Sequence, residues 1–267
     1  MDLATIIGLV VAIGGILVGQ VLEGGHISSI VQPTAALIVL GGTIGAVMVN
    51  YPMDVFLTAV KRTKLIFSRK KPDLAKLIEE VVAYAIEARK NGIIALEQSA
   101  QKASDPFLTK AILMAVDGTD SKRMRENLEL VISREEEEGE HVAKVYESAG
   151  GYSPTIGIIG AVLGLIHVMS NLADVGAVGS GIAVAFVATI YGVATANIFF
   201  LPAAGKLKLI SREQIVVKEL VLEGVLAIQE GMNPKLVRDK LMAFLHEHPK
   251  KGSEAAAGAP AAAPARA

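Results

Sequence analysis

The chain has 267 residues, 52% of them hydrophobic, and a mean hydropathy of +0.47, which is too apolar for an ordinary soluble domain and indicates a membrane protein. It contains no Cys, which excludes a disulfide framework, a thiolate metal site and a cysteine nucleophile. The net charge is only −1, but its distribution is uneven, because no Lys or Arg lies within residues 1–60 or 145–205.

Each of these two blocks without basic residues contains two uncharged runs long enough to cross a membrane. A bilayer core of about 30 Å requires about 20 apolar residues in a helix. In chain order, the predicted spans are Leu3–Leu22, Ile30–Val49, Tyr152–Leu172 and Ile182–Ala203. The first span follows Asp2 instead of a basic segment and lacks a small-residue cleavage site, so we expect a retained span and not a signal peptide.

The connectors within the two pairs of spans predict the orientation. Residues 23–29 and 173–181 contain no Lys or Arg, whereas basic residues are frequent in the segments that follow spans two and four. Because basic segments stay on the cytoplasmic side, both connectors should face outward and both termini should be cytoplasmic. The predicted fold class is therefore all-α, a polytopic membrane protein with four transmembrane helices and a helical cytoplasmic domain.

This pattern predicts five segments. They are transmembrane helices one and two with their short outer loop (1–51), a cytoplasmic helical domain (52–149), transmembrane helices three and four (150–204), C-terminal cytoplasmic helices (205–248) and a disordered Ala/Pro-rich tail (249–267). Apolar residues at helical spacing, together with Gly and Pro stop signals, predict cytoplasmic helices over 71–91, 93–103, 107–117, 121–147, 206–228 and 234–246. The helix over 121–147 should continue into the third span.

The charged segments lack catalytic signatures. They contain no P-loop, HExxH or GxSxG pattern, and the five His residues do not cluster with carboxylates at metal-binding spacing. We therefore expect no enzyme activity, no metal and no cofactor. The four spans contain no internal Asp, Glu, Lys or Arg, and only His167 could titrate there. Since ion carriers normally use an ionisable group within the membrane, a partner must supply the carboxylate if this chain moves ions.

The third and fourth spans carry uncharged polar groups and small residues. The polar residues are Thr155, Ser170, Asn171, Thr189, Tyr191, Thr195 and Asn197. Gly157, Gly160, Ala161 and Gly164 form a stripe of small residues that allows close helix approach. Pro154 and Pro202 free backbone carbonyls near the ends of these spans. Ordinary packing between helices explains any one such residue, but their concentration favours a lined pathway or a partner surface.

Four segments match one known family. They read GGTIGAVMVNYP (41–52), EARKNGIIALE (87–97), SPTIGIIGAVLGLI (153–166) and VATIYGVATANIFFLPAAGKL (187–207). With the four spans, the large loop between spans two and three and the paired prolines, they resemble the MotA/PomA family of flagellar stator proteins. The resemblance covers roughly residues 1–245.

The resemblance implies roles for nine residues. The implied ion-pathway residues are Thr189, Ala161, Tyr191 and Thr155, the implied coupling prolines are Pro154 and Pro202, and the implied rotor-binding residues are Arg89, Lys90 and Glu97. It also implies that the missing carboxylate is an aspartate on the single span of a MotB-like or PomB-like partner.

The family likeness further implies the assembly and the activity. About five copies of the chain would surround two partner spans in the bacterial inner membrane, in contact with lipid. Ion flow would drive torque on the rotor protein FliG, and no nucleic acid is involved. In sodium-type members, the position of Ala161 is usually threonine and the pair Ala188-Thr189 tends to be Thr-Thr. Because two oxygens that could replace water around sodium are missing here, protons are the expected ion.

Other functions remain open from the sequence. An ExbB/TolQ-like subunit resembles spans three and four but has three spans, and an ion-driven motor for a non-flagellar task or a sodium-driven stator would share most of the pattern. A membrane scaffold that conducts nothing is a different class, and would tolerate Thr189→Val. A secondary transporter usually has inverted repeats and its own intramembrane charges, and neither is found here.

Overall fold

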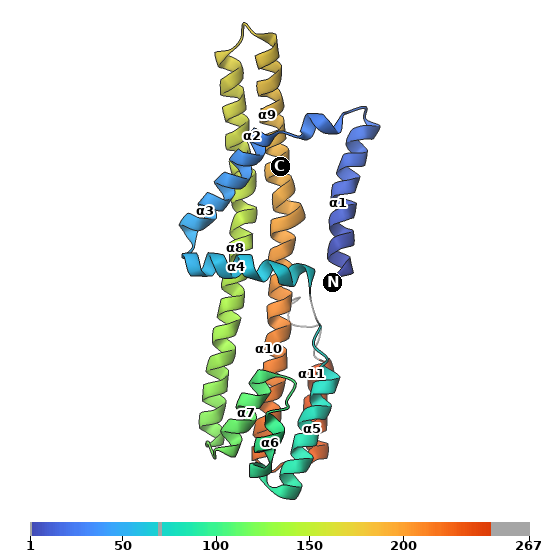
Figure 1. Ribbon diagram of the computed structural model, residues 1–267, viewed down its shortest axis with the longest axis vertical. Coiled ribbons are helices and arrows are strands. Elements are labelled where there is room, and N and C mark those ends of the chain that lie inside the picture. The colour runs from blue at the N-terminus through green and yellow to red at the C-terminus, as the bar shows by residue number, and fades with distance from the viewer. Residues whose placement is uncertain (1, 69–70, 247–267) are drawn as a thin grey trace, which may run out of the picture. The chain divides into compact units, whose positions relative to one another are not determined.

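The computed structural model describes residues 2–68 and 71–246, and within them every regular element is a helix (Figure 1). The elements are α1 (Leu3–Leu22), η1 (Ile27–Ile30), α2 (Pro33–Ala36), η2 (Leu37–Gly41), α3 (Gly42–Asn50), α4 (Met53–Phe67), α5 (Leu74–Asn91), η3 (Ile93–Ala95), α6 (Leu96–Ala100), α7 (Pro106–Val116), α8 (Ser121–Ser170), α9 (Val175–Ala194), η4 (Thr195–Phe200), α10 (Leu201–Gln229) and α11 (Pro234–His246). The predicted all-α class is confirmed. The predicted tail, 249–267, lies outside the described residues.

Four segments of the described chain are long and apolar enough to cross a membrane. They are Leu3–Leu22, Ile27–Asn50, Ser121–Ser170 and Val175–Gln229. Each contains most or all of one predicted span, and α1 coincides with the first. The second connector was predicted too long, because α9 already begins at Val175. The cause is Asp174, whose carboxylate accepts hydrogen bonds from the amides of Gly176 (2.9 Å) and Ala177 (3.2 Å) and caps the helix.

Two compact units make up the chain. The first comprises Met1–Lys71 and Ser133–Ile215, and the second comprises Pro72–Ile132 and the residues from Val216 onward. Helices α8 and α10 each contribute to both units. The continuity predicted between the helix over 121–147 and span three is confirmed, since α8 runs unbroken for 50 residues, about 75 Å at 1.5 Å per residue (Figure 1).

Helix α4 in the first unit was not predicted. Its basic residues concealed an apolar face on which Ala59 and Ile66 are buried in one cluster with Val142 and Tyr146 of α8. The Tyr146 hydroxyl donates a hydrogen bond to the Ala59 carbonyl (3.2 Å). Contact with α8 therefore holds this amphipathic helix in place within the first unit.

The second unit packs α5, α6, α7 and α11 with the first turns of α8 and the end of α10. Its fully buried large side chains include Ile78, Leu96, Leu108, Ile112, Met124, Leu128, Leu220 and Leu241. Helix α5 ends at Asn91 as predicted, because Gly92 takes φ +83°, which favours glycine. The helix predicted over 93–103 is shorter than expected. It consists of η3 and α6 and ends at Ala100, before the Asp105 cap of α7.

Candidate functional site between spans three and four

The third and fourth spans meet through glycine. A Cβ atom built on Gly157 of α8 would lie 2.9 Å from the Ala188 carbonyl oxygen and 3.1 Å from Cα of Gly192. A Cβ on Gly164 would lie 2.8 Å from the Gly181 carbonyl oxygen. Only hydrogen atoms fit at these points, so the two backbones are in direct contact, as the predicted stripe of small residues requires.

Ser153 is the polar centre of this interface, and sequence reasoning missed it. Its side chain is fully buried, and its hydroxyl contacts the Gly192 carbonyl (3.0 Å) and the Thr195 hydroxyl (2.7 Å). The Thr195 hydroxyl also lies 2.7 Å from the Tyr191 carbonyl. Its place in the interface could have been inferred from helical spacing, because Ser153 lies four residues before Gly157 and therefore on the same face of the helix.

The four predicted ion-pathway residues do not gather at one point within this chain. Thr189 and Ala161 are half-buried at the margin of the α8–α9 interface. Thr155 is exposed, and about 200° of helix rotation separates it from Ser153, so it lies on the face of α8 away from α9. The Thr155 and Thr189 hydroxyls bond to carbonyls of their own helices, at Tyr152 (2.8 Å) and Ala185 (3.2 Å).

These bonds explain how an apolar span tolerates hydroxyl and amide groups. Asn197 likewise donates to the Val193 carbonyl (2.9 Å), four residues earlier. In hydrocarbon an unsatisfied polar group is costly, and a bond to the preceding turn removes much of that cost.

Tyr191 has a specific partner that the sequence did not reveal. Its hydroxyl donates to the Ile30 carbonyl (2.7 Å) and accepts from the Gln32 amide (3.2 Å). Beside it, Val187 and Ala188 form a buried cluster with Ala35 and Val39. Tyr191 therefore fastens the start of span two to span four, and this contact orients its hydroxyl toward the first connector.

Removing this hydroxyl should loosen the connector. Tyr191→Phe leaves the Ile30 carbonyl and the Gln32 amide without their partner, and we expect a loss of about 1–3 kcal/mol in local stability. Hydrogen exchange of the Gln32 amide in the purified protein measures this loss. Tyr152→Phe is the matched control, because no hydrogen bond of the Tyr152 hydroxyl is found within the described residues. Equal exchange rates in the two variants would contradict the anchoring role.

The two predicted coupling prolines lie in different surroundings. Pro154 lies inside α8 and faces Gly192 of α9, since a Cβ atom built on Gly192 would be 3.2 Å from the Pro154 Cα. Pro202 follows η4, a π-helical turn over Thr195–Phe200 that connects α9 to α10. Gly192 faces Pro154, so Pro202 lies ten residues beyond that level, roughly 15 Å along the helix. The sequence did not predict the π turn, a feature that often occurs at functional sites.

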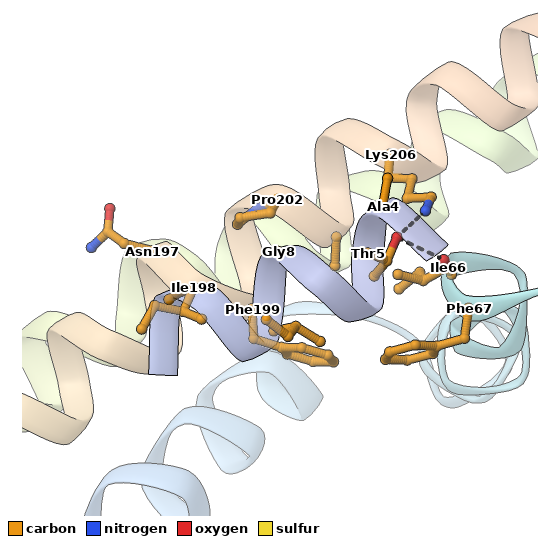
Figure 2. A pocket seen from close by; sticks show the side chains of 13 residues that line it. Ala4, Thr5, Gly8, Ile66, Phe67, Asn197, Ile198, Phe199, Pro202 and Lys206 are labelled. Atoms are coloured by element: carbon orange, nitrogen blue, oxygen red, sulfur yellow. Dashed lines mark hydrogen bonds between the residues drawn. The ribbon is translucent and has the colours of Figure 1, made fainter. Parts of the chain in front are cut away.

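A cavity of about 350 Å³ opens beside Pro202 (Figure 2). Its walls come from α1, the end of α4, η4 and α10, and its lining residues include Gly8, Phe67, Asn197, Ile198, Pro202 and Lys206. The Lys206 ammonium at one end contacts the Thr5 hydroxyl and lies 2.5 Å from the Asp2 carboxylate. Hydrogen bonding to Lys206 lowers the pKa of Asp2, so this carboxylate is charged at neutral pH.

The predicted rotor-binding residues lie in the second unit, around one turn. Arg89 and Lys90 occupy the last turn of α5, Glu97 lies in α6, and all three are exposed. Gly92, with its positive φ, forms the turn between α5 and the η3–α6 segment. The three charged side chains therefore lie on either side of this turn, where they are accessible to another protein surface.

Tyr84 holds α5 against α6 beneath these charges. Its hydroxyl lies 3.3 Å from both the Ser99 carbonyl oxygen and the Glu80 carboxylate. Burial and the nearby Glu80 charge raise the pKa of Tyr84 to about 12, so the hydroxyl stays protonated and able to donate. The Ser99 hydroxyl adds a second link by donating to Glu87 (2.9 Å).

Comparison with known proteins assigns the chain to a family. Residues 6–92 match the model of the motility protein A N-terminal region, and residues 99–219 match that of the MotA/TolQ/ExbB proton channel family. The chain is 34% identical to motility protein A of Bacillus subtilis over 92% of this chain and 91% of that protein. It is 36% identical to chemotaxis protein PomA of Vibrio alginolyticus over 92% of this chain and 96% of that protein.

A solved structure of the MotAB complex of C. jejuni superposes on the chain with a TM-score of 0.87. The two sequences are 32% identical, and the match covers 94% of this chain and 98% of that one. Since the relatives match nearly end to end and both family models fit in order, the chain belongs to the MotA/PomA family of motility proteins.

Proposed function

We propose that this chain is a stator subunit of the flagellar motor, which converts an ion-motive force into torque together with a MotB-like partner. The observation that carries this proposal is the glycine-packed pair α8–α9, with Ser153, Thr195 and Thr189 in and beside it and without Asp, Glu, Lys or Arg in either predicted span. Such a pair can guide an ion but lacks the carboxylate that would bind it.

The partner completes the ion site. A MotB-like chain contributes the ion-binding aspartate on a single span, and Thr189 with Ala161 lies along the route that the aspartate faces. Thr155 lies on the opposite face of α8 from the α9 contact and reaches the route from a neighbouring copy. The matched MotAB complex supports a shared assembly. We propose about five copies in the inner membrane, in contact with lipid, with both termini cytoplasmic.

Torque leaves the complex through the second unit. Arg89, Lys90 and Glu97 engage charged residues of the rotor protein FliG, and their exposure around the Gly92 turn supports this role. Two basic residues and one acidic residue at this turn suit a contact that forms and releases repeatedly, because each exposed ion pair with the rotor would be weak.

Protons are the proposed ion. Ala161 has a methyl group at a position where a side-chain oxygen could coordinate sodium. Ala188 is fully buried, and a Cβ on Gly160 would lie 2.8 Å from the Ala188 Cβ, so this position serves close packing and offers no ligand.

The test is motility in a stator-deficient host that receives this chain and its neighbouring partner gene. We expect swimming whose speed ignores external sodium at fixed osmolarity and falls to zero when a protonophore is added. A speed that rises with sodium would keep the motor and overturn the choice of ion. Expression of both chains in the membrane without swimming would overturn the flagellar role and favour an ExbB/TolQ-like motor.

A further inference from the structure

Polar contacts attach the first turn of α1 to the rest of the first unit. None of the residues of α1 is buried. At its start, however, the Asp2 amide donates to the Phe67 carbonyl (2.9 Å), and the Thr5 hydroxyl lies 3.4 Å from the Ile66 carbonyl. The N-terminal end of α1 is thereby tied to the end of α4.

Lys206 joins these two helices to α10. Its ammonium lies 2.5 Å from Asp2 and contacts Thr5, and the Lys206 and Asp2 side chains are only 17% and 18% exposed. A nearby pair on the same helix differs, since Lys208 and Glu147 are 48% and 42% exposed. The Asp2–Lys206 pair is thus the more shielded from water, and loss of one partner leaves a poorly solvated charge.

The position of Lys206 connects this cluster to the proposed coupling segment. Lys206 lies four residues after Pro202, and both line the cavity beside α1 (Figure 2). Residues four apart share a helix face, so the face of α10 that carries Pro202 is the face that holds α1. The π turn of η4 ends just before, at Phe200.

We propose that Asp2, Thr5 and Lys206 are positioning residues that fasten α1 to α10 one turn after Pro202, so that α1 and this turn move together during the ion-driven cycle. This proposal rests on the proposed stator function. Without these contacts, movement at Pro202 would separate α10 from α1, and α1 would not follow the movement of α10.

The first measurement is the rotation speed that each newly added complex contributes when stators are induced one by one in a motor that carries a tethered bead. Asp2→Asn keeps a good helix cap but removes the charge, and Lys206→Gln removes the other charge. We expect each to lower the speed increment about threefold with a normal number of increments. The double variant Asp2→Asn with Lys206→Gln should lower the increment no further than either single variant, because all three remove the same pair, and Lys208→Gln is the matched control.

Two outcomes would overturn the proposal. One is that the Lys206 variants match the Lys208 control. The other is that fewer complexes join while each keeps its full increment, which would mean that the residues serve assembly alone.

Hydrogen exchange of the purified complex separates this proposal from the stator function. If the wild-type chain produces no rotation, the stator function fails, and the fastening is then judged by exchange of the amides in the first two turns of α1. We expect these amides to exchange about tenfold faster in Asp2→Asn and Lys206→Gln, while Lys208→Gln leaves them unchanged. Equal rates in all variants would overturn the fastening itself.

Discussion

Replacement of Gly192 by leucine is expected to prevent α8 from packing on α9, so that the protein does not accumulate in the membrane. A Cβ at this position would lie 2.7 Å from the Ser153 carbonyl oxygen, 3.0 Å from Cα of Gly157 and 3.2 Å from Cα of Pro154. All three atoms belong to the backbone, so no side chain can rotate away. The helices must separate, which also breaks the bond from the Ser153 hydroxyl to the Gly192 carbonyl.

A smaller substitution gives a graded form of the same test. Gly192→Ala should cost about 1–3 kcal/mol by overpacking. Gly205→Ala is the matched control, because no atom lies within 4 Å of a Cβ built there. The measurements are the amount of chain in the membrane and the thermal unfolding midpoint of the extracted complex. Normal amounts and an unchanged midpoint in the Gly192 variants would show that the two helices are not in direct backbone contact.

Replacement of Pro202 by alanine is expected to leave assembly intact and to lower the torque of each complex about tenfold or more. Proline lacks an amide hydrogen, and its ring collides with the carbonyl four residues earlier, at Ile198, which lies within the π turn Thr195–Phe200. Alanine restores this hydrogen bond and favours a regular helix by about 3 kcal/mol, so the segment resists the movement that the proposed coupling role requires.

The readouts are the speed increment per added complex and the amount of chain in the membrane. Pro33→Ala is the control, since Pro33 occupies the first turn of α2, where a missing amide hydrogen has little effect. A Pro202→Ala chain that rotates the motor as fast as wild type would show that coupling does not depend on this proline.

The local features of the chain were largely predictable. A run of 20 uncharged residues defines α1, and Asn91-Gly92 ends α5 because glycine readily takes a positive φ. The features that were missed depend on distant partners. Helix α4 carries basic residues and is recognisable only when its apolar face meets Val142 and Tyr146.

The candidate site divides in the same way. The small residues of α8 and the two prolines were visible in the sequence, because their chemistry acts within a helix or at its surface. The burial of Ser153, the contact of Tyr191 with Ile30, and the position of Thr155 away from α9 were not visible. Each depends on the rotation of one helix about its axis, and helical spacing does not determine which face meets which neighbour.

The sequence by itself determined the four spans, the all-helical class and the absence of Asp, Glu, Lys and Arg inside the predicted spans. These follow from composition and periodicity, since a run of about 20 apolar residues crosses hydrocarbon as a helix that satisfies its own backbone hydrogen bonds, and an unpaired charge there is costly. The tertiary structure alone decided that Asp2 pairs with Lys206 across 204 positions and that a π turn precedes Pro202. Such features arise when helices distant in sequence pack together, because contacts between side chains then outweigh the local preferences of the chain.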